Sequence, residues 1–480
     1  MSIRPNERDD VASPATSPAS PPPPEVEREL AGGTPGDTYE DDPSAPVVAK
    51  SLLFPFAIVT SLFFLWGVAN DLTNPMVSAF KKVMPELSNF EAALVQMAFY
   101  GGYGTMAIPA ALFIRKYSYK SGILLGLGLY AAGAFLFYPA AANQQFGFFL
   151  ASLYVLTFGL AFLETTANPF ILSMGARATA TQRLNLAQAF NPVGSLLGML
   201  VAQLIVIDAL RSDDYSAEEY AALDAGSVAE IRTNDLDIIS TPYIGLGVLV
   251  LAIAVVIALT KFPDAGMHVR MTVRESWDRL KSNARYREGV LAQAFYVGAQ
   301  IMCWTFIFQY VDNLNASRGP EEQLTATWYN MAAMISFLSG RWVCTYLMRT
   351  IEGARLMMYF AIGGVALCAG VILLGGMAGL FCLIGVSVCM SLMFPTIYGI
   401  ALDGMGDEAK LGSAGLVMAI VGGALMPPLQ ASILDWGGEG FADLAILGFI
   451  PEVNFSFILP LVCLAVVGVY AKRSVGSSSG

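Results

Sequence analysis

The chain has 480 residues, of which 55% are hydrophobic and 14% are charged. Soluble domains carry roughly 25% charged residues, so this composition indicates a polytopic membrane protein. The net charge of −11 does not point to nucleic-acid binding, because the acidic residues gather in the N-terminal tail and in some loops. The chain has a single histidine, His268, which argues against a histidine-based metal site. The sequence contains no Walker loop, so an ATP-driven pump is not expected.

The two ends of the chain are expected to lie outside the folded part. Residues 1–49 are rich in Pro, Ser, Asp and Glu and cannot bury enough apolar surface to fold, so we expect a disordered tail. No cleaved signal pattern is present, and the first apolar segment is expected to direct insertion. Residues 474–480 have the composition of a flexible linker.

Between these ends the sequence predicts twelve membrane spans. Their approximate limits are 52–74, 91–114, 120–141, 148–174, 183–207, 241–261, 289–312, 325–348, 355–376, 378–402, 412–434 and 453–472. Lipid cannot satisfy open backbone groups, so the spans are predicted to be helices. The fold class is therefore an all-α membrane protein.

The long basic segment after the sixth span divides the chain into two sets of six. We expect an N-terminal bundle at 50–262, a cytoplasmic linker at 263–288 and a C-terminal bundle at 289–473. Weak echoes between the halves, such as the prolines at Pro169 and Pro395, suggest repeats with a site between them near the midplane.

Basic residues predict the orientation. Lys and Arg follow the second, fourth, sixth, eighth and twelfth spans, whereas the segment near 208–240 is acidic and is expected to be an outer loop. The positive-inside rule then places both termini in the cytoplasm of a multi-pass cell-membrane protein. The cysteines fall in predicted spans without metal-ligand spacing and are expected to be buried free thiols.

Glu164 is the acid around which the spans are organised. It lies within the apolar run 148–174, where an ionised carboxylate costs about 3 kcal/mol on insertion scales. It could pair with a neighbouring helix or reach an interface, but we favour a protonatable group that faces an aqueous path. Asn168 follows one helical turn later on the same face.

The first span ends in a polar group that includes Asn70, Asp71 and Asn74. Spacings of three and four residues put these side chains on one helical face. Asp71 could also be simply hydrated at the outer end of the span.

Amide and aromatic side chains recur at helical spacing in three more spans. They are Gln96 and Tyr100, then Asn185, Gln188 and Asn191, then Gln293, Tyr296, Gln300 and Trp304. Any one buried amide could hold helices together. Together they suit a neutral ligand with many hydroxyls, such as a sugar. We expect Arg341 to be interfacial or to hold helices together.

Several segments resemble the major facilitator superfamily and, within it, the L-fucose:proton symporter family. The matching segments are 63–67 (FFLWG), 98–103 (AFYGGY), 163–170 (LETTANPF), 183–191 (RLNLAQAFN), 291–300 (LAQAFYVGAQ) and 394–397 (FPTI). The resemblance covers about 50–472 and implies two six-helix bundles that import a sugar with a proton by alternating access. It implies that Glu164 is a central proton- or sugar-linked carboxylate. Gln188, Asn191, Tyr296 and Gln300 would line the sugar cavity.

The chain departs from the family pattern where an aspartate is usual late in the first span, because Asn74 stands there. We hypothesise that Asp71, one turn earlier, shares the coupling role with Glu164. The alternative is an uncoupled carrier, or a sodium-driven one that uses the Asp71 oxygens. A sugar receptor and a drug-efflux carrier also remain alternatives.

We expect neither an enzyme nor a bound cofactor, because no nucleophile–base pair stands out in the spans. The expected partners are a sugar and the lipid bilayer, and the resemblance implies a monomer.

Overall fold

The computed structural model describes residues 46–73, 76–84, 87, 89–215, 219–220, 222–261, 272–316, 318–434, 445–446 and 450–476. The tail 1–45, His268 and residues 477–480 lie outside this part, so the expectations for them are not tested. The described chain is almost wholly helical, which confirms the expected fold class.

The N-terminal half contributes eight helices. They are α2 (Leu53–Thr73), α3 (Met76–Val83), α4 (Asn89–Lys116), α5 (Tyr119–Asn143), α6 (Phe146–Ser173), α7 (Ala180–Gln188), α8 (Asn191–Val201) and α10 (Ala225–Leu259). The short helices η1 (Lys50–Leu52) and η2 (Arg177–Thr179) precede α2 and α7. The segments η3 (Ala202–Val206), η4 (Ile207–Ala209) and η5 (Arg211–Asp214) follow α8.

The linker helix α11 (Val273–Ser282) leads into the C-terminal half. This half has α12 (Ala284–Thr305), α13 (Ile307–Asn315), α14 (Ala326–Leu347), α15 (Gly353–Leu374), α16 (Gly376–Met390), α17 (Met393–Leu402), α18 (Ala409–Met418), α19 (Gly422–Leu434), α20 (Glu452–Ser456) and α21 (Ile458–Ser474). Between them lie η6 (Pro320–Glu322), η7 (Gly406–Glu408) and η8 (Ala419–Val421). The short strands β1 (Ala445–Ile446) and β2 (Ile450–Pro451) pair antiparallel, with Ala445 opposite Pro451.

Eleven helical stretches among the described residues are long and apolar enough to cross a membrane. Some of these stretches join two labelled helices, such as Ala284–Asn315, which contains α12 and α13. The 22-residue α14 is also long enough but is more polar, since it carries Asn330 and Arg341. With α14 the structure is consistent with twelve spans.

The sixth span starts earlier than expected. The sequence predicts it at 241–261 after an acidic loop, whereas α10 already begins at Ala225. Asp224 caps this helix by accepting the backbone N–H groups of Gly226 and Ser227. Hydrogen bonds from the Ser227 side chain and from the backbone lower the pKa of Asp224. The loop expectation for 225–240 is therefore wrong, because a local cap and buried contacts extend the helix beyond its apolar part.

The linker also holds a helix where the sequence predicts only a basic segment. Thr272 and Glu275 form a capping box at the start of α11. The backbone hydrogen bond to Thr272 lowers the pKa of the Glu275 carboxyl. The helix reaches both halves, since Ser276 accepts a hydrogen bond from Arg115 at the end of α4 and Arg279 pairs with Glu408.

Helices α2 and α8 pack closely through a glycine on each helix. A Cβ atom on Gly67 of α2 would collide with the backbone carbonyl of Asn191. A Cβ on Gly194 of α8 would likewise collide with the carbonyl of Phe64. Small residues let two backbones approach in this way within membranes, so the two helices form one rigid wall.

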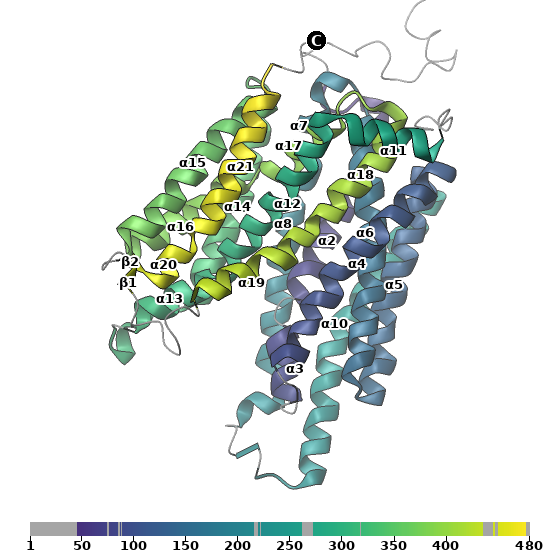
Figure 1. Ribbon diagram of the computed structural model, residues 1–480. Coiled ribbons are helices and arrows are strands. Elements are labelled where there is room, and N and C mark those ends of the chain that lie inside the picture. The colour runs from purple at the N-terminus through teal and green to yellow at the C-terminus, as the bar shows by residue number, and fades with distance from the viewer. Residues whose placement is uncertain are drawn as a thin grey trace, which may run out of the picture.

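Figure 1 shows the two halves side by side. Helices α2 to α10 form one bundle, and α12 to α21 form the other. Near the marked C-terminus, α7, α11, α17 and α18 bring the bundles together. At the opposite end α19 and α20 lie well apart from α3 and α10.

The six cysteines are free thiols, as expected. Cys303, Cys344, Cys368 and Cys463 are buried, whereas Cys382 and Cys389 are partly exposed.

Candidate functional site

A cavity lies between the two bundles. The space between the lining side chains amounts to about 910 Å³, a volume that includes open solvent. The side chains that line it from the N-terminal half are Phe63, Trp66, Asn70, Asp71, Tyr100, Tyr103, Glu164, Gln188, Asn191, Pro192 and Ser195; those from the C-terminal half are Tyr296, Val297, Gln300, Ile301, Trp304, Met334, Phe337, Arg341, Phe394 and Ile420. The cavity therefore combines apolar and aromatic surface with a limited set of polar groups, as ligand sites do.

Glu164 projects into this cavity from α6. Its Oε2 atom is buried and has no hydrogen-bond partner. Within the described residues the carboxylate takes part in no ion pair. A buried acid without a compensating partner is costly when ionised, so this position favours a group that changes its protonation during function.

Asn168 lies behind the cavity wall rather than in it. Its side chain is fully buried and donates to the backbone carbonyl of Glu164 at 3.0 Å. Its Oδ1 accepts a 2.8 Å hydrogen bond from Gln188, which does line the cavity. The helical spacing of Glu164 and Asn168 thus places Asn168 as a support for its neighbours, because its amide bonds are directed at protein atoms.

The break between α7 and α8 places two amides at the cavity. Gln188 is the last residue of α7, and Asn191 is the first of α8. Asn191 donates to the carbonyl of Phe63 at 3.1 Å, which fixes α8 against α2. A helix break leaves backbone groups free for such contacts, so the cavity wall here is held by side-chain bonds.

The wall from α12 carries Tyr296, Gln300 and Trp304. The hydroxyl of Tyr296 is buried without a partner. Trp304 donates its indole N–H to the Ser387 hydroxyl at 3.2 Å. Trp304 therefore offers the cavity a ring surface rather than a donor.

Four buried polar atoms of the lining residues have no protein partner. They are Glu164 Oε2, Asn70 Oδ1, Trp66 Nε1 and Tyr296 Oη. Native proteins satisfy nearly all buried polar groups, so exceptions gathered at one cavity indicate a place where a polar ligand binds. Both donors and acceptors are present, which suits hydroxyl groups.

Asp71 lines the cavity next to Asn70, near the end of α2. Asn74 and the side chain of Gln96 lie outside the described part of the structure, so the expectations for them are not tested. Tyr100 lines the cavity. Two amides of the predicted stripes, Asn185 and Gln293, are fully buried and are not among the lining residues.

Arg341 has a role that the sequence indicates only in part. It is 3% exposed and donates to the carbonyl of Ser391 at 2.5 Å, so it holds helices together as expected. However, it lines the cavity instead of lying at a membrane interface. It also donates to the carbonyl of Gln188 at 2.9 Å and thereby joins the two bundles. The sequence places Arg341 only toward the basic end of a span. It does not predict the contact with Gln188, because that contact depends on which face of α14 meets α7 in the fold.

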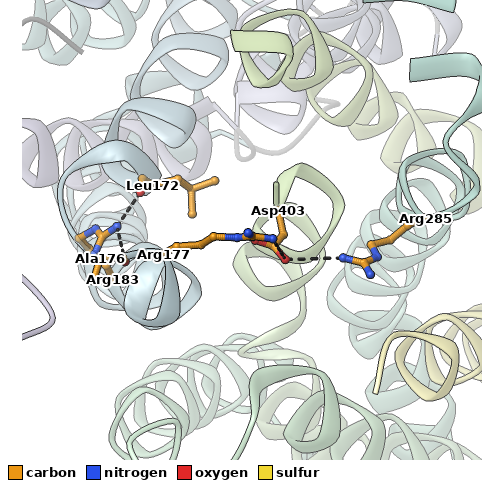
Figure 2. Close-up of polar contacts among 6 residues, drawn as sticks. All are labelled: Leu172, Ala176, Arg177, Arg183, Arg285 and Asp403. Atoms are coloured by element: carbon orange, nitrogen blue, oxygen red, sulfur yellow. Dashed lines mark hydrogen bonds and ion pairs between the residues drawn. The ribbon is translucent and has the colours of Figure 1, made fainter. Parts of the chain in front are cut away.

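The bundles are joined at the end that carries the basic loops. Arg177, from the N-terminal half, donates to Asp403 of the C-terminal half at 2.7 Å. Arg285 approaches the same carboxylate at 3.6 Å, and Figure 2 shows the two arginines reaching Asp403 from opposite sides. Asn185 and Thr396 add a neutral hydrogen bond across the bundles at 3.2 Å. The cavity is therefore shut at this end.

Arg183 supports this end from within the N-terminal half. Its guanidinium is fully buried and donates to backbone carbonyls in the last turn of α6 and just after it, including those of Leu172 and Ala176 (Figure 2). It also donates to Val47 at 3.1 Å, which ties down the segment before α2. Arg183 thus serves as a cap for the end of α6, where helical carbonyls lack partners.

The fold and the cavity define a class of protein. Two helical bundles that enclose a polar cavity, shut at one end and open to solvent, have the arrangement of a secondary transporter that works by alternating access. It is not the arrangement of an enzyme active site.

Comparison with known proteins gives the family. The model of the Major Facilitator Superfamily matches residues 51–427. The chain is 54% identical to the L-fucose-proton symporter of Haemophilus influenzae, over 90% of this chain and 99% of that one. It is 33% identical to a putative glucose/galactose transporter of Helicobacter pylori, over 84% and 94%. This chain therefore belongs to the Major Facilitator Superfamily.

A solved structure agrees with this assignment. The crystal structure of the transporter FucP in the outward conformation superposes with a TM-score of 0.77 at 32% identity, over 88% of this chain and 99% of that one.

Proposed function

We propose that this protein imports L-fucose or a related monosaccharide together with a proton. The observation that carries the proposal is the cavity between the bundles, which is lined by Glu164 and by three further residues with orphaned polar atoms. The identity to a relative named as an L-fucose-proton symporter supports both the substrate class and the coupling ion. The relatives named as glucose/galactose transporters keep other hexoses in the substrate range.

Glu164 is the proposed coupling residue. With the cavity open to the outside, it takes up a proton, and the sugar binds beside it. A neutral carboxyl costs far less than a charged one when the cavity closes and excludes water. After the bundles rock, proton and sugar leave on the other side. The two fluxes are tied together if the protein that carries only the proton or only the sugar closes less readily than the protein that carries both.

Asp71 is the proposed second acid. It lines the cavity close to the outer end of α2, on the path from outside to Glu164. The proton is preferred over sodium as the coupling ion, because the relative with 54% identity is named an L-fucose-proton symporter.

The sugar contacts are proposed to come from both bundles. Asn70, Tyr100, Gln188 and Asn191 serve on one side. Tyr296 and Gln300 serve on the other with their polar groups, and Trp304 with its ring. Asn168 acts through Gln188.

The membrane orientation is also a proposal. Helix α21 ends near the marked C-terminus (Figure 1), and its last turn carries Lys472 and Arg473. Arg473 pairs with Glu288, which follows Arg285 by one turn in α12. The positive-inside rule makes this end cytoplasmic. The shut end then faces the cytoplasm, and the cavity faces outward in a monomer whose two bundles move about the linker at 263–288.

Transport in proteoliposomes tests the proposal. The purified protein is reconstituted, and uptake of labelled L-fucose, galactose and glucose is followed under an inward proton gradient, an inward sodium gradient or none. We expect accumulation above equilibrium with the proton gradient only, abolished by a protonophore. Accumulation that needs sodium, or equilibration without accumulation under every gradient, would overturn proton coupling, and no counterflow of any sugar would overturn the substrate class.

A further inference from the structure

Arg341 is a buried cation at the centre of the molecule that the coupling scheme does not use. Its side chain is 3% exposed and lines the cavity. Within the described residues it forms no ion pair. Its guanidinium stacks on the ring of Phe337, with 4.6 Å between the guanidinium carbon and the ring centroid. A buried charge without a carboxylate needs several hydrogen-bond acceptors to offset its desolvation.

The protein supplies acceptors for only part of this group. A guanidinium has five N–H donors in a planar fork. Nε donates to the carbonyl of Ser391, and Nη1 donates to the carbonyl of Gln188. No described acceptor takes the Nη2 group. Since Arg341 lines the cavity, a ligand bound there can supply acceptors that the protein does not.

The two backbone bonds also fix the orientation of the guanidinium. The carbonyl of Ser391 lies at the break between α16 and α17, and that of Gln188 ends α7. One bond comes from each bundle, so the plane of the guanidinium is set before any ligand arrives. Donors held in place in this way lose little freedom on binding.

We propose that Arg341 is a specificity-determining residue that binds two neighbouring hydroxyl oxygens of the sugar. The planar fork suits a pair of adjacent oxygen acceptors, which a single ammonium group matches less well. The ligand class is a pyranose with a vicinal diol. The inference rests on the proposed function and goes beyond it, because it assigns a substrate contact to a residue of the C-terminal bundle and to a defined pattern of hydroxyls.

Monodeoxy sugars provide the test. Competition binding gives the dissociation constants of the sugar that wild type binds best and of its monodeoxy analogues. They are measured for purified wild type, R341Q and R341K. Hydrogen bonds to charged groups are worth enough that R341Q is expected to lose affinity by about 10- to 100-fold. In wild type, removal of either of two adjacent hydroxyls is expected to cost a similar factor.

The decisive readout is discrimination rather than affinity. R341Q should bind those two deoxy analogues nearly as well as the parent sugar. Removal of any other hydroxyl should lower the affinity of R341Q by the same factor as in wild type. R349Q is the matched control, because Arg349 lies just after the same helix and is exposed; its penalties should not change. A purely structural role would lower thermal stability but leave the pattern of penalties intact, and that result would overturn the proposal.

R341K keeps the test falsifiable if R341Q does not fold. It retains a charge but lacks the planar fork. Removal of at least one of the two adjacent hydroxyls should therefore no longer lower the affinity of R341K. A wild-type pattern in R341K, or equal binding of all deoxy analogues by wild type, would contradict the proposal while leaving sugar transport in place. Failure of wild type to bind any sugar would instead overturn the proposed function as well.

Discussion

At the residue scale, the cavity brings an acid and its supports into one hydrogen-bonded chain. Gln188 donates to Asn168, and Asn168 donates to the backbone of Glu164. Arg341 reaches the same chain at the carbonyl of Gln188. A sugar that contacts Gln188 would therefore touch a residue that is linked both to the α6 backbone at Glu164 and to the opposite bundle.

Asp71→Asn tests whether the second acid takes part in coupling. We expect the variant to lose most of the proton-driven accumulation of sugar, because an amide cannot titrate. Sugar counterflow, which needs no net proton movement, should persist. Both are measured in proteoliposomes.

The control for this variant is Asp312→Asn, which removes an exposed acid of α13 that does not line the cavity. Accumulation should be unaffected there. Unchanged accumulation in Asp71→Asn would show that the acid has not moved from the position of Asn74 to that of Asp71.

Residue patterns in the sequence predict this site in part. The apolar sequence around Glu164 is enough to predict that this acid is functional. Helical spacing groups Gln188 with Asn191 and Tyr296 with Gln300. The same spacing cannot distinguish a side chain that faces the cavity from one buried just behind it, as with Asn168. It also cannot show the contact of Arg341 with Gln188, which depends on how two distant helices cross.

At the element scale, close packing of α2 on α8 sets one wall of the cavity. Gly67→Ala places a methyl group against the carbonyl of Asn191 and, at 2.6 Å, against the amide of Ser195. Overpacking of this kind costs about 1–3 kcal/mol, so the melting temperature in detergent should fall. Sugar affinity should fall with it, because Asn191 lines the cavity.

Gly128→Ala is the matched control, since an added Cβ at this glycine of α5 meets no atom within 4 Å. It should leave the melting temperature equal or slightly higher, because alanine favours helix more than glycine does. Equal melting temperatures for the two variants would contradict the packing account.

The apolar runs predict the positions of most helices but not their ends or breaks. The extension of α10 to Ala225 depends on the cap at Asp224 and on the buried Asp235, which accepts the backbone N–H groups of Arg211 and Ser212. The breaks after Gln188 and Met390 fall inside predicted spans, and the overall hydropathy of a span does not locate them. They are nevertheless the places where backbone carbonyls become available to Arg341.

At the scale of the whole molecule, ion pairs and hydrogen bonds shut the end that carries the basic loops. Arg177 and Asp403 are partly exposed, so their pair contributes less than about 1 kcal/mol. Such a weak closure suits a transporter, because the two bundles must separate at this end in every cycle. Sequence charge predicts which end is basic but not which arginine meets which acid.

Asp403→Asn should weaken this closure. Both Arg177 and Arg285 lose their charged partner, and the inward-open population should rise by about threefold to fivefold. A reporter is available in S413C, since Ser413 is buried and donates across the bundles to the carbonyl of Thr165. Its labelling by a cytoplasmic maleimide should be faster by the same factor in the Asp403→Asn background.

Glu288→Gln serves as the control, because Glu288 pairs with Arg473 within one bundle. The variant removes an ion pair at the same end, but this pair does not join the two halves. Labelling of S413C should therefore stay at its original rate. Equal labelling in the Asp403→Asn background would contradict the assigned role of Asp403.

Glu164→Gln tests the central claim most directly. Uptake of labelled sugar into proteoliposomes is compared with and without an inward proton gradient, and counterflow is measured on the same preparation, with Glu230→Gln as the exposed control. The account predicts that Glu164→Gln abolishes accumulation above equilibrium and keeps counterflow, while the control retains both. Accumulation at the wild-type level by Glu164→Gln would contradict it.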